Sequence, residues 1–185
     1  MSQHTVRKKP RKPHQFRFQL LTEWLTATYQ PCKIADIGGG KGLLAYLLSQ
    51  NGFNTVVIDP VSQNLPHKFK DLKENKRVKL ADLEAVKRIS EPFQTEMAQD
   101  FDLLIGLHTH GSNMKIIDAA KKYDKDFVLL PCCVIDEPIV KRHNVDWLES
   151  LVEYAQLQGL YIKKVQLNFM GQNIALYTDK YQAKR

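Results

Sequence analysis

Apolar runs alternate along the chain with segments whose apolar residues recur at helical spacing. The runs suit strands buried on both faces of a sheet, and they cover residues 34–37, 54–59, 101–107 and 127–130. The helical spacing predicts helices over residues 14–29, from Leu43 to the Asn51–Gly52 stop, after Ser112 as a cap, and from an Asn144 cap to Gly159. A strand, a helix and a strand within about 30 residues make a right-handed βαβ unit, so this order predicts an α/β fold with a parallel sheet.

Two further regions are predicted from weaker patterns. Residues 161–169 and 173–178, joined through Gly171, have the pattern of a hairpin that would finish the sheet. Residues 60–100 are mostly polar and basic, and there the pattern indicates only a short third strand at residues 77–80. Asp82 would stand just past the end of that strand, or would cap a helix over residues 83–89.

The strongest local signal is a glycine turn between the first strand and the helix that follows it. Gly38, Gly40 and Gly42 lie at a spacing of two, so the backbone can turn sharply and a ligand can approach the main chain at a helix N-terminus. Asp59 closes the second strand about 20 residues later, where a carboxylate can accept hydrogen bonds from ribose hydroxyls. The pair predicts a nucleotide-type site.

Two ligand classes fit this site, and a tight turn without any ligand is a third reading. Residues 40–45 match the G-x-G-x-x-A pattern of dinucleotide sites, so NAD remains an alternative. Asp36, two residues before the first glycine, would repel a pyrophosphate but suits a ligand that carries a sulfonium and an ammonium group. We therefore predict S-adenosyl-L-methionine as the cofactor. A Walker A loop is excluded because no Gly-Lys-Ser/Thr follows.

The carboxyl ends of the later strands carry further polar residues. His108 follows the strand at 101–107 and could act as a general base, orient a substrate hydroxyl, or hold its own turn by a backbone hydrogen bond. Ligands in open α/β sheets bind beyond the carboxyl ends of the strands, so Asp36, Asp59, His108 and Cys132–Cys133 should surround one crevice.

The paired cysteines could also suggest a metal, with His108, His110 or His143 completing the ligands. Side chains of adjacent residues point to opposite faces of an extended strand, which is awkward for one tetrahedral ion. We therefore predict no metal and expect Cys132 and Cys133 to pack at the strand end.

Length, charge and cysteine content narrow the class of protein. The 185 residues suit one domain over residues 14–185, preceded by a disordered basic arm over residues 1–13. Six positive charges precede the first acid, Glu23, and the net charge is +7, so the arm could contact the phosphates of RNA or could be a solvated tail. No apolar run of 18 residues and no secretory h-region is present, which with three cysteines predicts a cytoplasmic protein without a membrane span. The oligomeric state stays open.

Two stretches resemble a known family. Residues 34–45 resemble motif I of the Rossmann-like methyltransferases that use S-adenosyl-L-methionine. Residues 106–111, Gly-Leu-His-Thr-His-Gly, together with Cys132–Cys133, resemble the G-L-H-T-C-G and Cys-Cys segments of a group of eukaryotic methyltransferase-like proteins. More distantly, they resemble the H-L-C-G motif of tRNA 2′-O-methyltransferases that modify the acceptor stem. Lys41 matches the G-x-G-K-G of those enzymes.

This resemblance implies a class I sheet of seven strands with helices on both faces and a terminal antiparallel hairpin. In that family the glycine turn seats the amino-acid end of the cofactor, which implies cofactor-binding roles for Gly38, Gly40, Lys41 and Gly42. It also implies that Asp36 helps to orient the ammonium, Asp59 holds the ribose, and Asp82 meets the adenine amino group.

The predicted function is methyl transfer from S-adenosyl-L-methionine to RNA, with tRNA or rRNA as the first substrates. The chain has Leu107-His108-Thr109-His110 where enzymes that methylate exocyclic amines carry an Asn/Asp-Pro-Pro-aromatic motif, so that device is absent. A small-molecule or protein methyltransferase is an alternative. A non-catalytic cofactor-binding or RNA-binding partner protein is another.

Overall fold

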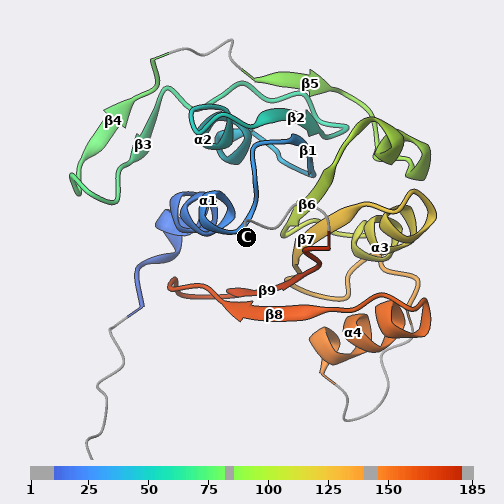
Figure 1. Cartoon of the computed structure of the whole chain (residues 1–185). Coiled ribbons are helices and arrows are strands. Elements are labelled where there is room, and N and C mark those ends of the chain that lie inside the picture. Colours follow the sequence, from blue (N-terminus) through green and yellow to red (C-terminus); the bar gives the residue numbers. More distant parts are fainter. Residues whose placement is uncertain (1–10, 82–85, 140–145, 181–185) are drawn as a thin grey trace, which may run out of the picture.

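The computed structural model describes residues 11–81, 86–139 and 146–180. Within these residues, seven strands form one sheet in the order β5-β2-β1-β6-β7-β9-β8 (Figure 1). The strands are β5 (Lys87–Ile89), β2 (Asn54–Ile58), β1 (Lys33–Ile37), β6 (Leu103–Leu107), β7 (Asp126–Leu130), β9 (Ile174–Tyr177) and β8 (Lys163–Gln166). The predicted seven-stranded α/β sheet is confirmed.

The central strands pair in parallel, and the last two are antiparallel. β1 pairs with β2 and with β6, and β6 pairs with β7, all in parallel register. β9 lies antiparallel to both β7 and β8, so the predicted terminal hairpin closes one side of the sheet. Every residue of β6 and β7 is buried, as expected for strands covered on both faces.

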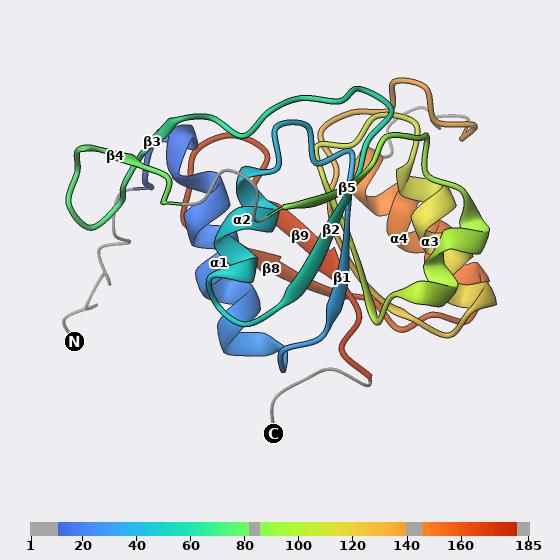
Figure 2. The same ribbon diagram turned by 90° about the horizontal axis from the view of Figure 1, so that it is seen from above.

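Helices cover both faces of the sheet, as Figure 2 shows from above. On one face lie α1 (Arg17–Thr28) and α2 (Leu43–Ser49), and on the other lie α3 (Asn113–Lys122) and α4 (Trp147–Leu157). The core is correspondingly split into two main clusters, with Leu25 and Leu44 on the first face and Ile116 and Leu151 on the second. No described helix is long and apolar enough to cross a membrane.

The segment between β2 and β6 differs most from the prediction. The strand predicted at residues 77–80 exists as β4 (Arg77–Lys79), but it pairs antiparallel with β3 (Lys68–Lys70) in a separate two-stranded sheet. The third strand of the main sheet is instead β5, which pairs in parallel with β2. The alternative of a helix over residues 83–89 is wrong at residues 87–89, which form this edge strand.

The N-terminal segment also differs in part from the expected arm. Residues 1–10 lie outside the described residues, but Lys12 pairs with the loop before β9. Its N–H donates to Asn168 at 3.1 Å, and its carbonyl accepts from Met170 at 2.8 Å. The prediction of a disordered arm is therefore wrong at Lys12, because two backbone hydrogen bonds hold that residue. A short 3-10 turn, η1 (His14–Phe16), then leads into α1, close to the predicted start at His14.

The cap predicted for the helix after β6 is replaced by a distant one. Ser112 occupies the N-cap position of α3, but its side chain makes no capping hydrogen bond. The carboxylate of Glu137 accepts hydrogen bonds from the backbone N–H of Asn113 at 2.7 Å and of Met114 at 3.1 Å. Glu137 thus holds the loop after β7 against the start of α3. The predicted Asn144 cap lies outside the described residues, and the helix it would open starts at Trp147.

Candidate cofactor site

The glycine turn has the backbone conformation that its sequence predicts. Gly38, Gly40 and Gly42 have positive φ angles of 66°, 52° and 80°, a region that favours residues without a Cβ. The turn leaves β1 and opens α2, with the Gly38 N–H donating to the carbonyl of Ile58 on β2 at 2.8 Å. Glycine recurs at every second position because the turn needs a positive φ angle at each of these three residues.

Asp36 lies buried beneath this turn. Its side chain is 1% exposed, and a Cβ added at Gly39 would overlap its carboxylate. Oδ2 of Asp36 accepts no hydrogen bond within the part of the chain that the structure describes. Burial raises the pKa of Asp36 to about 7, against opposing contributions from the Ala45 backbone and the positive charge of Arg88. A buried carboxylate with a free oxygen is costly unless a donor or cation from outside completes it.

Two charged side chains hold the glycine turn from its outer side. Oδ2 of Asp59 accepts from the Gly40 N–H at 2.9 Å, and Oδ1 accepts from the Val61 N–H at 2.8 Å. Arg88 on β5 donates from Nη1 to the carbonyl of Gly40 at 2.7 Å and from Nη2 to that of Lys41 at 2.5 Å. The forked guanidinium suits two neighbouring carbonyls. Arg88 was absent from the sequence prediction.

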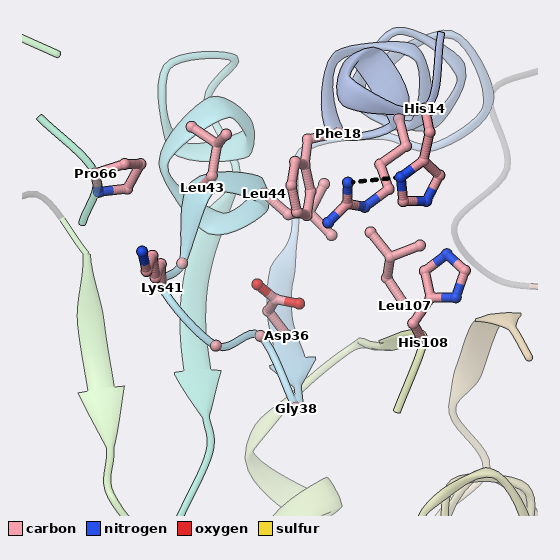
Figure 3. A pocket seen from close by; sticks show the side chains of 14 residues that line it. His14, Phe18, Asp36, Gly38, Lys41, Leu43, Leu44, Pro66, Leu107 and His108 are labelled. Atoms are coloured by element: carbon pink, nitrogen blue, oxygen red, sulfur yellow. Dashed lines mark hydrogen bonds between the residues drawn. The ribbon is translucent and has the colours of Figure 1, made fainter. Parts of the chain in front are cut away.

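A cavity of about 500 Å³ opens above Asp36, and Figure 3 shows its lining. Asp36 points into it between the turn that carries Lys41 and the end of β6 that carries His108. β1 contributes Asp36 and the turn contributes Gly38, Gly39, Gly40, Lys41 and Gly42. The end of β6 contributes Leu107 and His108, and other elements contribute His14, Arg17, Phe18, Leu43, Leu44 and Pro66.

The N-terminal turn and α1 supply a wall that the sequence did not identify. His14, Arg17 and Phe18 line the cavity, and the Arg17 guanidinium lies 4.2 Å from the centroid of the Phe18 ring. Nη1 of Arg17 lies 3.2 Å from Nδ1 of His14, while Nε of Arg17 is buried and has no hydrogen-bond partner among the described residues. Burial lowers the pKa of Arg17. The helical spacing of residues 14–29 could locate α1, but only its docking on α2 brings its first turn to the cavity.

His108 stands beside His14, at the end of β6, in a strained backbone conformation. Its φ angle is 57°, its N–H donates to the carbonyl of Leu130 at 3.2 Å, and its ring meets that of His14 at a centroid distance of 5.8 Å. Burial, followed by the nearby Arg17, His14 and His110, lowers the pKa of His108 to about 4. The ring is therefore neutral near pH 7. Its Nε2 is buried without a partner from the described part of the chain.

The structure brings together some of the predicted crevice and separates the rest. Asp36, Gly38, Gly40, Lys41, Gly42 and His108 all line the cavity. Cys132 and Cys133 do not line it, so the single crevice predicted for all of these residues is wrong for the two cysteines. Asp59 does not line it either, but it is hydrogen-bonded to Gly40, which does. The Asp59 carboxylate accepts hydrogen bonds from the backbone N–H groups of Gly40 and Val61 instead of facing the cavity. Asp82 lies outside the described residues.

Cys132 and Cys133 instead form a separate cluster with His110. Sγ of Cys132 lies 3.5 Å from Sγ of Cys133 and 3.5 Å from Nε2 of His110. The prediction that the two side chains point to opposite faces is wrong, because β7 ends at Leu130 and both cysteines follow in irregular chain.

Comparisons with known proteins agree with this fold. No protein-family model matches the chain. A probable tRNA (uracil-O(2)-)-methyltransferase of Caenorhabditis elegans is 33% identical over 105 residues, which are 56% of this chain and 18% of that protein. The match thus spans less than a fifth of that relative's length.

Solved structures resemble most or all of the chain at low sequence identity. A precorrin-6y C5,15-methyltransferase of Geobacter metallireducens matches with a TM-score of 0.50 and 15% identity, covering 100% of this chain and 92% of that one. A ribosomal protein L11 methylase of Lactobacillus delbrueckii subsp. bulgaricus matches with a TM-score of 0.49 and 17% identity, covering 89% and 77% of the two chains. With the strand order and the terminal hairpin described above, the chain has the Rossmann-like fold of the class I methyltransferases.

Proposed function

We propose that the chain is a methyltransferase that uses S-adenosyl-L-methionine. The observation that carries this proposal is Asp36, a buried carboxylate with an unpartnered oxygen that points into the cavity beneath three glycines of positive φ. A ligand with an ammonium and a sulfonium would supply the missing positive charge. A dinucleotide pyrophosphate would place negative charge next to that carboxylate instead.

The other residues of the site fit the remaining parts of this ligand. Arg17 lines the cavity with a buried and unsatisfied Nε, in terms of the described chain, and could pair with the carboxylate of the methionine end. Asp59 is held rigid by two backbone donors and keeps spare lone pairs for ribose hydroxyls. Gly38, Gly40, Lys41 and Gly42 would form the floor against which the ligand lies.

When bound, the cofactor supplies a methyl group on a positively charged sulfur, which an acceptor displaces in line. Positioning of the two partners then provides much of the rate. His108, which lies beside His14 in the cavity lining, is neutral near pH 7, so its Nε2 can accept a hydrogen bond from an acceptor hydroxyl. A pKa of about 4 makes it a weak base, and we propose that it orients the acceptor rather than removing its proton.

RNA is the acceptor that we propose, with tRNA as the first substrate to test. The tRNA substrate in the name of the C. elegans relative supports this choice, although the match covers only part of that protein. The cluster of Arg7, Lys8 and Lys9 ahead of the domain adds positive charge suited to phosphates.

Calorimetry with S-adenosyl-L-methionine, its demethylated product and NADH tests the cofactor. We expect the first two to bind and NADH not to bind. Asp36→Asn should weaken binding of S-adenosyl-L-methionine by about ten-fold, which corresponds to about 1.4 kcal/mol. Asp100→Asn is the matched control, because Asp100 is exposed and distant in sequence from the turn. Tight NADH binding with no heat from the other two would overturn the proposal.

Transfer of a labelled methyl group to total RNA, protein and metabolite pools tests the substrate. Label in RNA is expected, and label only in another pool would reject RNA as the acceptor. RNA affinity should then be measured against salt after replacing Arg7, Lys8 and Lys9 by glutamine. This variant is preferable to deleting residues 1–13, since Lys12 is bonded to the loop before β9. Each lost phosphate contact should reduce the salt slope by about 0.7 to 0.9.

A further inference from the structure

We propose that His110, Cys132 and Cys133 bind one zinc ion, at a site separate from the cofactor cavity and independent of the proposed function. The three residues come from the loops that follow β6 and β7. One ligand atom from each lies within 4.8 Å of the other two. Imidazole nitrogen and cysteine sulfur are the ligands that Zn²⁺ prefers in proteins.

The spacing of the ligand atoms is close to what a tetrahedral ion needs. With Zn–S near 2.3 Å and Zn–N near 2.1 Å, the edges of the tetrahedron are about 3.8 Å between sulfurs and about 3.6 Å between sulfur and nitrogen. The observed distances are 3.5 Å between Cys132 Sγ and Cys133 Sγ, 3.5 Å between Cys132 Sγ and His110 Nε2, and 3.7 Å between Cys133 Sγ and His110 Nδ1. The sulfurs already have the spacing that the ion needs, and a rotation of the His110 ring would bring one of its nitrogens toward both sulfurs.

The two loops that carry these ligands are already joined to one another. Glu137, four residues after Cys133, accepts from the backbone of Asn113 and of Met114, and also from Asn113 Nδ2 at 2.7 Å. The Gly111 N–H donates to the carbonyl of Ile135 at 3.2 Å. Little chain entropy is then lost when the ion binds, because these bonds hold the ligand loops together before it arrives.

Three protein ligands leave one position of a tetrahedral ion open. His110 is exposed and the two cysteines are half-buried, so that fourth position faces solvent and can take water or an exchangeable ligand. The ion would also fix the loop that carries His108, since His108 and His110 are two residues apart. The zinc site is therefore expected to order one wall of the cavity.

Metal titration of the reduced full chain tests the site directly. After removal of bound metal with a chelator, Zn²⁺ should bind one per chain in competition with a zinc-sensitive dye. Co²⁺ should give the absorption of a tetrahedral thiolate complex. Cys132→Ser, Cys133→Ser and His110→Gln should each weaken Zn²⁺ binding by at least ten-fold. Cys32→Ser is the matched control and should bind normally, because Cys32 precedes β1 and lies in the apolar core cluster that includes Leu25.

Alkylation followed by mass spectrometry gives a second readout, which reports on the two cysteines directly. Zn²⁺ should protect Cys132 and Cys133 from the reagent, and thermal unfolding should confirm that each variant is folded. Any of three results would overturn the proposal: no stoichiometric Zn²⁺ on the reduced chain, unchanged binding in both cysteine variants, or unchanged alkylation of Cys132 and Cys133 with Zn²⁺.

Discussion

Asp59 accepts a hydrogen bond from the backbone N–H of Gly40, at 2.9 Å and across 19 residues of sequence. The end of β2 thereby fixes the middle of the glycine turn that begins at the end of β1. The same carboxylate accepts from Val61, so it also orders the chain that leaves β2. An acid at this position serves the shape of the site before any ligand arrives.

Asp59→Ala removes both of these acceptors. We expect a loss of about 1–3 kcal/mol in the free energy of unfolding, because two backbone N–H groups lose a charged partner. Binding of S-adenosyl-L-methionine should weaken by about ten-fold or more through the loosened turn and the lost ribose contact. Chemical denaturation and calorimetry measure the two effects. Asp100→Ala should change neither quantity. If Asp59→Ala has the stability and the cofactor affinity of the wild type, the glycine turn does not depend on Asp59.

The pKa of Asp36 predicts a distinctive dependence on pH. A carboxyl that titrates near 3.9 in the unfolded chain and near 7 in the folded chain leaves the folded chain with more bound protons between those values. Stability contributed by Asp36 should therefore fall as pH rises from about 4 to about 7, and stay level above that. Asp36→Asn should flatten this part of the curve. Melting temperatures of the wild type and of Asp36→Asn between about pH 4 and pH 7 measure this effect. Parallel plots of melting temperature against pH would show that Asp36 does not titrate in this range.

Arg88 links the glycine turn to the carboxylate of Asp36. Arg88→Ala removes two hydrogen bonds to backbone carbonyls and a positive charge that lowers the pKa of Asp36. We expect weaker cofactor binding by about five- to ten-fold, or about 1–1.4 kcal/mol. The pH midpoint at which binding appears should also move upward, because a cation needs the ionised carboxylate. Lys87→Ala on the same strand is the control. If the wild type, Arg88→Ala and Lys87→Ala share one pH midpoint of binding, Arg88 does not influence the ionisation of Asp36.

The sequence predicted the sheet and the turn because both depend on local patterns. The apolar runs at 34–37, 101–107 and 127–130 and the glycines at 38, 40 and 42 specify their structure within a few residues. Arg88 could not be predicted in this way, since it lies 48 residues from Gly40 on a three-residue edge strand within a polar, basic segment.

The same limit applies to the walls of the cavity and to the cysteines. Arg17 and His14 reach the site through the docking of α1, which no local spacing encodes. Cys132 and Cys133 lie beyond the end of β7 at Leu130, so the alternation rule for strands does not apply to them.

His108 should matter for turnover more than for cofactor binding. His108→Asn suits the backbone, because asparagine tolerates the positive φ of 57°. We expect the methylation rate at saturating substrate to fall by about ten-fold, with the affinity for S-adenosyl-L-methionine changed by less than two-fold. Because the pKa of His108 is about 4, the wild-type rate should show no titration of this group between about pH 6 and 8. A change of the methylation rate near pH 6.5 that is lost in His108→Asn would contradict the proposal that His108 only orients the acceptor.

Glu137 provides the last test, because it joins the helix start to the loop after β7. A carboxylate at a helix N-terminus is favoured by the unpaired N–H groups and the helix dipole, and Glu137 satisfies Asn113 and Met114 together. Glu137→Gln keeps one acceptor oxygen but loses the charge, so we expect a loss of about 0.5–2 kcal/mol in the free energy of unfolding. Asp136→Asn is the matched control, since Asp136 is exposed and asparagine accommodates its φ of 60°.

If the loop contact also orders the ligands of the proposed zinc site, Glu137→Gln should weaken Zn²⁺ binding while Asp136→Asn leaves it unchanged. Equal stability and equal Zn²⁺ affinity in the two variants would show that Glu137 neither stabilises α3 nor organises the His110–Cys132–Cys133 cluster.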